Sequence, residues 1–489
     1  MQKKFLSGLF LMLLFNLLIK PFWMLGIEIE VQNRVGAEAY GLYFAIFNTT
    51  FLFNILLDFG ITNYNNRHIA QNNQLLSKQF SGTIPLKLML GILFTIVTFF
   101  VGFLLGYDGY QYYLLGILCF NQFLSSFILY LRSNLSALLM FKVDSLLSVL
   151  DRSLMILFCG ILLWGNVSDK PFQIEWFIYS QTAAYLLTAA IALMIIVRKT
   201  KYFKIRFNKA FAFSILKQSF PFAVLVLLMT FYNRIDSVIM LKMLGKSEGS
   251  YYSGIYAMAY RLLDAVNMIA YLFSILLLPI FSRMLKDKQN IHRITKLAFS
   301  LIFILSVSIA TSLSFQSTAV MGLLYEHDLE ISSNVFRVLI LGFIPIATTY
   351  IFGTLLTAGG TLKQLNMIAG MGVILNITFD LIFIPQHNAM GAAWTSLTTQ
   401  SLTAFCQMLY ALYYFKIKIR WKFPTKLLLY ALVIVLLNVL LKHLGVELLH
   451  VVLIIGVVSI VLPFALRIVG LKAILHFIRA EVFSSKAEQ

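Results

Sequence analysis

Long apolar runs recur along the chain, each about the 20 residues that cross a bilayer as a helix. In lipid every backbone amide and carbonyl must be hydrogen-bonded within the protein, and a helix achieves this by itself. We therefore expect an all-α polytopic membrane protein. About fourteen runs qualify as spans: 5–27, 40–64, 84–106, 111–132, 144–164, 174–197, 214–241, 252–281, 297–324, 335–358, 364–384, 389–415, 425–442 and 448–468.

The amino-acid composition also indicates a protein embedded in a membrane. The chain is 60% hydrophobic and only 12% charged, against roughly a quarter charged in soluble domains. The net charge of +19 raises the question of a nucleic-acid partner, but the cations recur between apolar runs, as cytoplasmic loops require, so we expect none. Cys119, Cys159 and Cys406 all lie inside apolar runs. They predict neither a disulfide framework nor a metal site, and we expect no cofactor.

Charge alternates between the two sides of this arrangement. The segment 198–213 is strongly basic and would be cytoplasmic, whereas the outer segments are acidic. This pattern predicts that both termini face the cytoplasm. The acidic residues assigned to outer loops are Glu28, Glu30, Glu38, Glu326, Asp328 and Glu330.

A short motif occurs twice. Residues 36–43 read GAEAYGLY and residues 245–256 read GKSEGSYYSGIY, each with a Gly-x-Tyr end. An even number of spans separates the copies, so both halves insert with the same orientation, as in parallel-repeat transporters. We predict two pseudo-symmetric six-helix lobes, residues 1–205 and 206–420, followed by two extra helices and a cytoplasmic tail in residues 421–489.

Ionisable residues inside spans are the candidate functional residues, because each costs roughly 2.5–3.5 kcal/mol on insertion near the bilayer centre. They are Lys20, Asp58, Asp151, Arg152, Arg234, Asp236, Arg261, Asp264 and Asp380.

Lys20, Arg234 and Arg261 are predicted to form an anion site. Lys20 and Arg234 each lie about 20 residues before a repeat glycine, about 12 Å below the expected outer end of the helix at 1.5 Å per residue. Arg261 is expected at similar depth. Phosphate fits such a site because arginine can bind it with two parallel hydrogen bonds. Alternatively, these residues bind no anion: Lys20 extends outward to water, and Arg261 forms an ion pair with Asp264 on its own helix.

The intramembrane carboxylates predict other roles. Asp380 and Asp236 are candidates for coupling to a cation, either H⁺ or Na⁺. Alternatively, Asp236 forms an ion pair with a residue elsewhere in the protein. Asp58, near the inner end of its helix, could pair with Arg67 or another neighbour.

The sequence contains no complete enzyme motif. Gly245-Lys246-Ser247 resembles the end of a phosphate-binding loop, but Met240 occupies the position of its first glycine. The histidines show no metal-ligand spacing. We expect no catalytic residues and no metal.

Several stretches carry a family resemblance: RVGAEAYGLY (34–43), LLDFGITNY (56–64), SFPFAVLVLLMTFYNRIDSVIML (219–241), SGIYAMAYRLLD (253–264) and LLLPIFSRML (276–285). On these, the chain resembles the bacterial polysaccharide (Wzx-type O-antigen or capsule repeat-unit) flippases of the multidrug/oligosaccharidyl-lipid/polysaccharide (MOP) exporter superfamily. The resemblance implies a MATE-like fold in the bacterial cytoplasmic (inner) membrane.

It also implies a function. Such proteins carry an undecaprenyl-pyrophosphate-linked oligosaccharide to the outer leaflet by alternating access, through a cationic cavity to which Lys20, Arg234 and Arg261 could contribute. Membrane lipids and a polysaccharide polymerase would be partners. Three alternatives remain: a flippase for the peptidoglycan lipid precursor, a cation-coupled multidrug exporter, and a membrane glycosyltransferase or polymerase. The basic cavity residues argue against the exporter, and the short outer loops against the enzyme.

Overall fold

In the computed structural model every regular element among the described residues is helical. These residues are 15, 18–62, 65, 69, 74, 76–165, 167, 169–200, 209–418 and 421–468. The chain forms two compact units, Met1–Ala257 and Met258–Gln489, which are described separately. The predicted lobe boundaries at 205/206 and 420/421 stay predictions.

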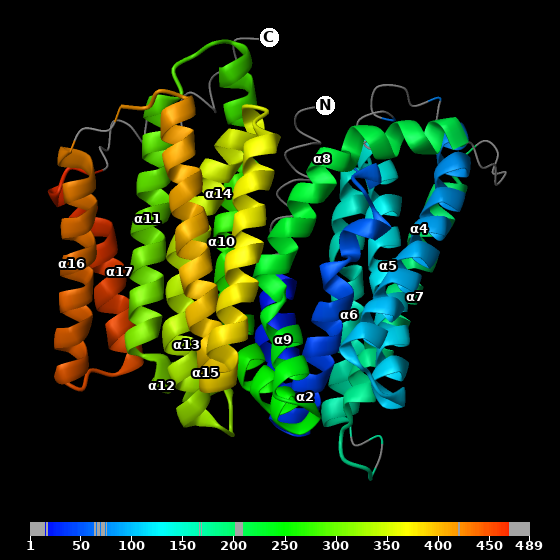
Figure 1. The fold of residues 1–489 in the computed structure, drawn as a ribbon, viewed down its shortest axis with the longest axis horizontal. Coiled ribbons are helices and arrows are strands. Elements are labelled where there is room, and N and C mark those ends of the chain that lie inside the picture. Colours follow the sequence, from blue (N-terminus) through cyan, green and yellow to red (C-terminus); the bar gives the residue numbers. More distant parts are fainter. Residues whose placement is uncertain are drawn as a thin grey trace. The chain divides into compact units, whose positions relative to one another are not determined.

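The first unit is a bundle of long helices with several breaks (Figure 1). Helix α5 packs against α2, α4 and α7, and α7 also packs against α6. Its elements are η1 (Trp23–Glu28), α2 (Ile29–Leu52), η2 (Asn54–Leu57), α4 (Leu76–Leu105), α5 (Gly109–Ala137), α6 (Phe141–Trp164), α7 (Ile174–Val197), α8 (Lys209–Arg234), α9 (Asp236–Met243) and the first part of α10 (Lys246–Lys286).

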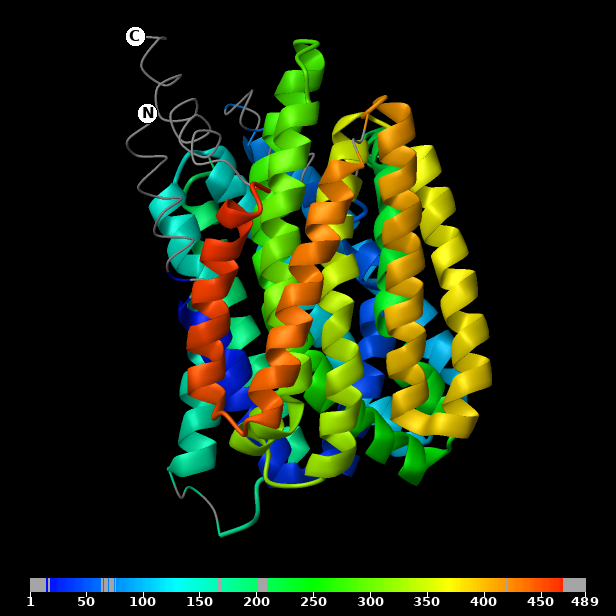
Figure 2. The ribbon, with the colours of Figure 1, turned by 90° about the vertical axis from the view of Figure 1, so that its left-hand side faces the viewer.

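The second unit contains the remainder of α10 and eight further elements. Helices α16 and α17 lie side by side and pack on α11 (Figure 2). Ser308 of α11 marks this contact, because its hydroxyl is hydrogen-bonded to Tyr430 and Ser459. The elements are α11 (His292–Phe315), α12 (Ser317–Leu324), α13 (Leu329–Leu339), η4 (Ile340–Gly342), α14 (Phe343–Ala358), α15 (Leu362–Tyr414), α16 (Lys422–His443) and α17 (Leu448–Ala465).

Element α15 is a hairpin of two helices. The backbone leaves helical geometry at Asn388, where φ is 52° and ψ is −130°. A Cβ on Gly391 would lie 2.3 Å from the carbonyl oxygen of Phe383, so only glycine allows the chain to reverse this tightly. The two halves correspond to the predicted spans 364–384 and 389–415.

The outward faces of the helices are apolar. Phe103 is 71% exposed, Ile374 67% and Val457 62%, an arrangement that lipid favours and water does not. Among the described residues, nine helices are long and apolar enough to cross a membrane, and ten if the bent pair α8–α9 counts as one span. A polytopic all-α membrane protein is therefore confirmed, while the count of fourteen spans stays a prediction.

The predicted end of the first helix, at residue 27, is wrong. The helix continues to Gly36, whose φ of 79° and ψ of 168° break it. Glu28 is buried and accepts a hydrogen bond from the Trp23 indole nitrogen at 3.1 Å, and Glu30 forms an ion pair with Arg34 at 2.8 Å. Glu28 and Glu30 therefore lie in the helix and not in an outer loop.

The two copies of the repeated motif meet in the first unit. Gly36 and Gly245, which begin the copies, both have positive φ, 79° and 81°, a conformation that glycine adopts without strain. A Cβ on Gly41 would lie 2.4 Å from the Gly254 nitrogen, and one on Gly254 would lie 1.9 Å from the Ala37 carbonyl oxygen. The backbones of α2 and α10 are thus in direct contact at the Gly-x-Tyr ends of the motif.

Candidate functional site

Lys20 lies just before a π-helical turn. Its side chain is half-buried, and η1 begins three residues later. Pro21 lacks an amide hydrogen, so the helix loses one backbone hydrogen bond at this point. Single π turns are frequent at functional sites. Trp23 bridges the turn through its bond to Glu28 and stacks on Phe177 of α7, with ring centroids 5.7 Å apart.

Arg152 of α6 approaches the same turn. Its guanidinium lies 5.6 Å from the Trp23 ring centroid and 5.9 Å from that of Tyr185 in α7. These are cation–π contacts. The Asp151 carboxylate is 3.9 Å from Nε of Arg152, which is too long for a hydrogen bond. The aromatic faces and a hydrogen bond from Nη1 to the Met155 sulfur at 3.2 Å position the guanidinium, and Asp151 does not hydrogen-bond to it.

Lys20 and Arg152 belong to one electrostatic cluster. Lys20 interacts with the charges of Arg152, Asp151 and Arg132, and Arg132 is itself paired with Asp144 at 2.8 Å. Among the described residues, no ion pair or hydrogen bond holds the Lys20 ammonium. Lys20 is thus within electrostatic range of Arg152, which the sequence marked as an intramembrane ion without assigning it to a site.

Arg234 ends α8 at a bend of 51° between α8 and α9. Its side chain is half-buried, and the guanidinium lies 5.4 Å from the ring centroid of Phe51 in α2. A broken helix exposes backbone groups that can bind ions, so its ends are frequent ligand positions in transporters. The prediction of an anion-binding role for Arg234 stays a prediction.

Asp236 is the first residue of α9 and only 1% exposed. Its carboxylate accepts a hydrogen bond from the Tyr256 hydroxyl of α10. Next to it, Ser237 accepts a hydrogen bond from the Asn48 amide of α2 at 2.8 Å. Asp236 therefore joins α9 to α10 inside the first unit, and its predicted role in cation coupling stays a prediction.

The remaining predicted site residues lie in the second unit. Arg261 of α10 is 9% exposed and Asp264, three residues later, is half-buried. Asp380 is completely buried in the first half of α15, one turn after the equally buried Asn376. The roles of Arg261 and Asp380 stay predictions.

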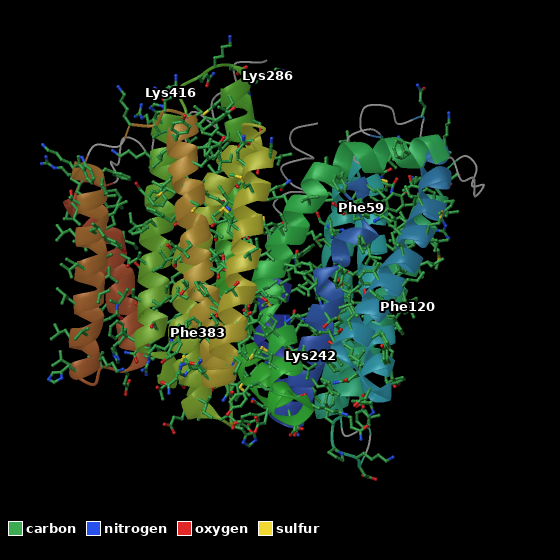
Figure 3. The ribbon with its side chains drawn as sticks, in the orientation of Figure 1. Phe59, Phe120, Lys242, Lys286, Phe383 and Lys416 are labelled. Carbon is green, nitrogen blue, oxygen red and sulfur yellow. The ribbon has the colours of Figure 1, made fainter. Side chains whose placement is uncertain are left out.

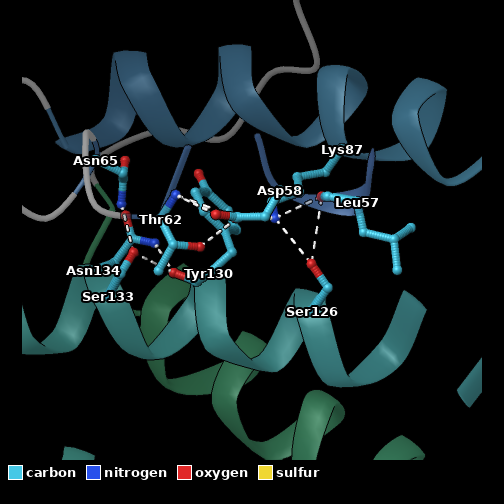
Figure 4. A network of polar contacts seen from close by, with 9 residues as sticks. All are labelled: Leu57, Asp58, Thr62, Asn65, Lys87, Ser126, Tyr130, Ser133 and Asn134. Atoms are coloured by element: carbon cyan, nitrogen blue, oxygen red, sulfur yellow. Dashed lines mark hydrogen bonds and ion pairs between the residues drawn. The ribbon is translucent and has the colours of Figure 1, made fainter. Parts of the chain in front are cut away.

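Lys87 of α4 is an intramembrane cation that the sequence reasoning missed, although it lies inside the predicted span 84–106. Its side chain is 1% exposed. The ammonium donates to the Asp58 carboxylate at 2.5 Å, to the Leu57 carbonyl at 2.9 Å and to the Ser126 hydroxyl at 3.2 Å (Figure 4). Asp58 also accepts from the Thr62 hydroxyl at 2.5 Å. Asp58 thus pairs with Lys87, and the alternative partner Arg67 lies outside the described residues.

Metal binding has no candidate in the part of the chain that the structure describes. No group of three or more His, Cys, Asp or Glu side chains is placed to hold a metal ion there. The cations described in the first unit instead differ in their partners: Lys87 is bound by a carboxylate, whereas Arg152 and Arg234 lie against aromatic rings.

Solved structures with the same fold are membrane transporters. The fold matches "Lipid II flippase MurJ, inward closed conformation" with a TM-score of 0.68 and 17% identity, over 93% of this chain and 99% of that one. It matches an inward-facing multidrug resistance MATE family transporter of the MOP superfamily with a TM-score of 0.61 and 15% identity, over 83% of this chain and 94% of that one. The fold class is therefore that of a MOP-type transporter.

The sequence comparison specifies the family. The model of the polysaccharide biosynthesis protein family matches residues 5–285, more than half of the chain, so the protein belongs to that family. No curated protein matches the sequence. The predicted resemblance to a polysaccharide family is thereby confirmed, with the fold of MOP-superfamily transporters.

Proposed function

We propose that the protein flips an undecaprenyl-pyrophosphate-linked oligosaccharide across the bacterial cytoplasmic membrane for surface polysaccharide synthesis. The observation that carries this proposal is the pair of intramembrane cations, Lys20 and Arg152, in a chain of the polysaccharide biosynthesis family. Burying cations within a span is costly, and in transporters such residues mark substrate pathways. A pyrophosphate headgroup is the anion that a lipid-linked sugar presents.

In this mechanism Lys20, Arg152, Arg234 and Arg261 bind the pyrophosphate, while the polyprenyl tail stays in lipid. Arg152 is positioned by Trp23 and Tyr185 and can offer its fork to two phosphate oxygens. The protein would alternate between inward- and outward-open states around the bound headgroup.

The membrane potential favours the outward step. The interior of a cell is negative, so each negative charge moved outward gains about 2.3 kcal/mol per 100 mV. A cation moving inward could supply the same drive, and Asp380 and Asp236 are the carboxylates proposed to carry H⁺ or Na⁺. A surface-polysaccharide polymerase would use the flipped product.

The decisive experiment is replacement of Arg234. Arg234→Ala should abolish export of surface polysaccharide while the protein remains folded and inserted. Arg234→Lys should retain charge but lose the two-pronged contact, so we expect export to fall by about tenfold. Surface polysaccharide is measured in cells lacking the natural copy, and membrane insertion by size-exclusion profile after detergent extraction. Normal export in Arg234→Ala would overturn the site assignment.

A peptidoglycan lipid-precursor flippase is the second candidate, favoured by the match over 99% of the MurJ chain. Complementation separates the two. The chain should restore polysaccharide in a strain lacking its repeat-unit flippase and should fail to restore growth in a strain depleted of its lipid II flippase. Rescue of growth alone would favour the second candidate, and resistance to cationic drugs without either rescue would favour a multidrug exporter.

A further inference from the structure

A small pocket lies at one end of the second unit, and none of the residues proposed to bind the transported substrate lines it. Its volume is about 270 Å³. Figure 3 shows Lys286 and Lys416 at this end of the unit and Phe383 toward the other; the charge pattern predicts that the lysine-bearing end faces the cytoplasm. The pocket is lined by His292, Thr295 and Lys296 at the start of α11, Phe352 of α14, Lys418 after α15, and Phe423 of α16.

Positive charge gathers at the mouth of this pocket. Lys296 and Lys418 are both exposed and line it from different segments. The Lys296 ammonium lies 4.6 Å from the ring centroid of Phe423, which fixes one cation against the pocket wall. The beginning of α11 adds the partial positive charge of a helix N-terminus. Among the described residues that line the pocket, none carries a carboxylate that would repel an anion.

Thr295 supplies an independent sign of a ligand. Its side chain is 3% exposed and lines the pocket. Its hydroxyl Oγ1 has no hydrogen-bond partner among the described residues. A buried hydroxyl without a hydrogen-bond partner reduces the stability of the fold by about 1–3 kcal/mol. A phosphate oxygen in the pocket could accept its hydrogen bond and remove this penalty.

The deeper walls of the pocket are apolar. Phe299 and Phe352 pack with ring centroids 5.2 Å apart, and Met408 and Leu412 of α15 complete the wall. The volume is below the roughly 300–1,000 Å³ of pockets that enclose drug-sized ligands. It suits a phosphate headgroup with the beginning of an acyl chain, and it is too small for an oligosaccharide. Basic pockets between helices at the cytoplasmic surface bind the headgroups of anionic lipids.

We propose that this pocket binds one anionic phospholipid, with the phosphodiester held by Lys296, Lys418 and Thr295 and an acyl chain against Phe299, Phe352 and Leu412. This site goes beyond the proposed transport function, because it concerns a lipid that is bound and not carried. A resident lipid would tie α11, α15 and α16 together at the membrane surface.

Native mass spectrometry of the delipidated full chain tests the proposal. Phosphatidylglycerol is titrated against phosphatidylcholine with the same acyl chains. The wild type should retain phosphatidylglycerol selectively. Lys296→Gln with Lys418→Gln should weaken that binding about thirtyfold, since each lysine near the surface contributes about 1 kcal/mol. Thr295→Val, which keeps the shape and removes the hydroxyl, should weaken it about fivefold.

The matched control is Lys286→Gln with Lys363→Gln. These two lysines are exposed and belong to the same unit but do not line the pocket, so binding should be unchanged. Equal phosphatidylglycerol binding by the pocket variant and the wild type would overturn the proposal, as would equal loss in the control. Displacement of the lipid by inorganic phosphate at matched concentration would instead define a site for free anions and also overturn it. None of these readouts depends on what the protein transports.

Discussion

Lys87 and Arg152 are both cations inside membrane-spanning helices of the first unit, but their surroundings differ. The Lys87 ammonium is bound by a carboxylate, a backbone carbonyl and a hydroxyl, all within 3.2 Å. The Arg152 guanidinium lies over two aromatic rings, and the adjacent carboxylate of Asp151 is 3.9 Å away. Lys87 is almost inaccessible, whereas the Arg152 side chain is 29% exposed.

This difference separates a structural cation from a candidate ligand-binding one. A buried charge whose hydrogen bonds are all made within the protein can do little except hold helices together. Lys87 ties α4 to η2 and α5, where the second span is broken after Leu52. Arg152 lies against two ring faces and donates one N–H group to the Met155 sulfur. A thioether is a weak acceptor, so a phosphate oxygen could compete for that N–H group.

The largest effect is expected at the Lys87 pair. Asp58→Asn removes the charge that compensates a buried ammonium, and breaking such a pair costs about 3–5 kcal/mol. The variant should unfold at markedly lower temperature in detergent, as followed by fluorescence-detected size-exclusion chromatography. Asp58→Leu combined with Lys87→Met removes both charges and should recover most of the stability. A stable Asp58→Asn protein that cannot export would instead make this pair part of the transport machinery.

Arg152 should show the opposite pattern. Arg152→Met keeps the length of the side chain and loses the charge, so export should fall by at least about tenfold. Stability should fall by only about 1–2 kcal/mol, the value of the two ring contacts. Arg34→Met is the control, because Arg34 is an exposed arginine of the same unit paired with Glu30. Normal export by the Arg152→Met protein, or its failure to fold, would contradict a ligand-binding role for Arg152.

The smallest effect is expected at the exposed pair of Asp108 and Lys246. Hydrogen bonds from Lys246 and from the Gln111 amide lower the pKa of Asp108 from its ordinary value of 3.8. The stabilisation is therefore complete above that unfolded-state value and is lost as the pH falls through the lower folded-state pKa. The difference in thermal midpoint between wild type and Asp108→Asn should shrink below about pH 4.

Added salt should distinguish the exposed pair of Asp108 and Lys246 from the buried pair of Asp58 and Lys87. Exposed pairs are screened by added salt and buried pairs much less. Raising the salt concentration at neutral pH should erase the difference between wild type and Asp108→Asn while leaving the effect of Asp58→Asn intact. Equal salt sensitivity of the two variants would contradict the burial assigned to Lys87.

Where the sequence reasoning failed, the cause was a polar residue with a hidden partner. The predicted first span ends at residue 27, and Glu28 and Glu30 are assigned to the loop after it, yet Trp23 and Arg34 satisfy these carboxylates within the same helix. Lys87 was overlooked as an intramembrane ion, and its partner Asp58 lies 29 residues away in the chain. The reversal at Asn388 was predicted well, because the polar residues between two apolar runs mark it.

The amino-acid sequence determined by itself that this chain is a polytopic helical membrane protein and that it belongs to the polysaccharide biosynthesis protein family. In lipid, the helical structure of each apolar run follows from its own residues, because the run must form all its backbone hydrogen bonds within itself. Only the tertiary structure decided which buried cations are held by carboxylates and which by aromatic rings. That outcome depends on side chains from separate helices meeting at specific distances, and periodicity along one helix does not encode it.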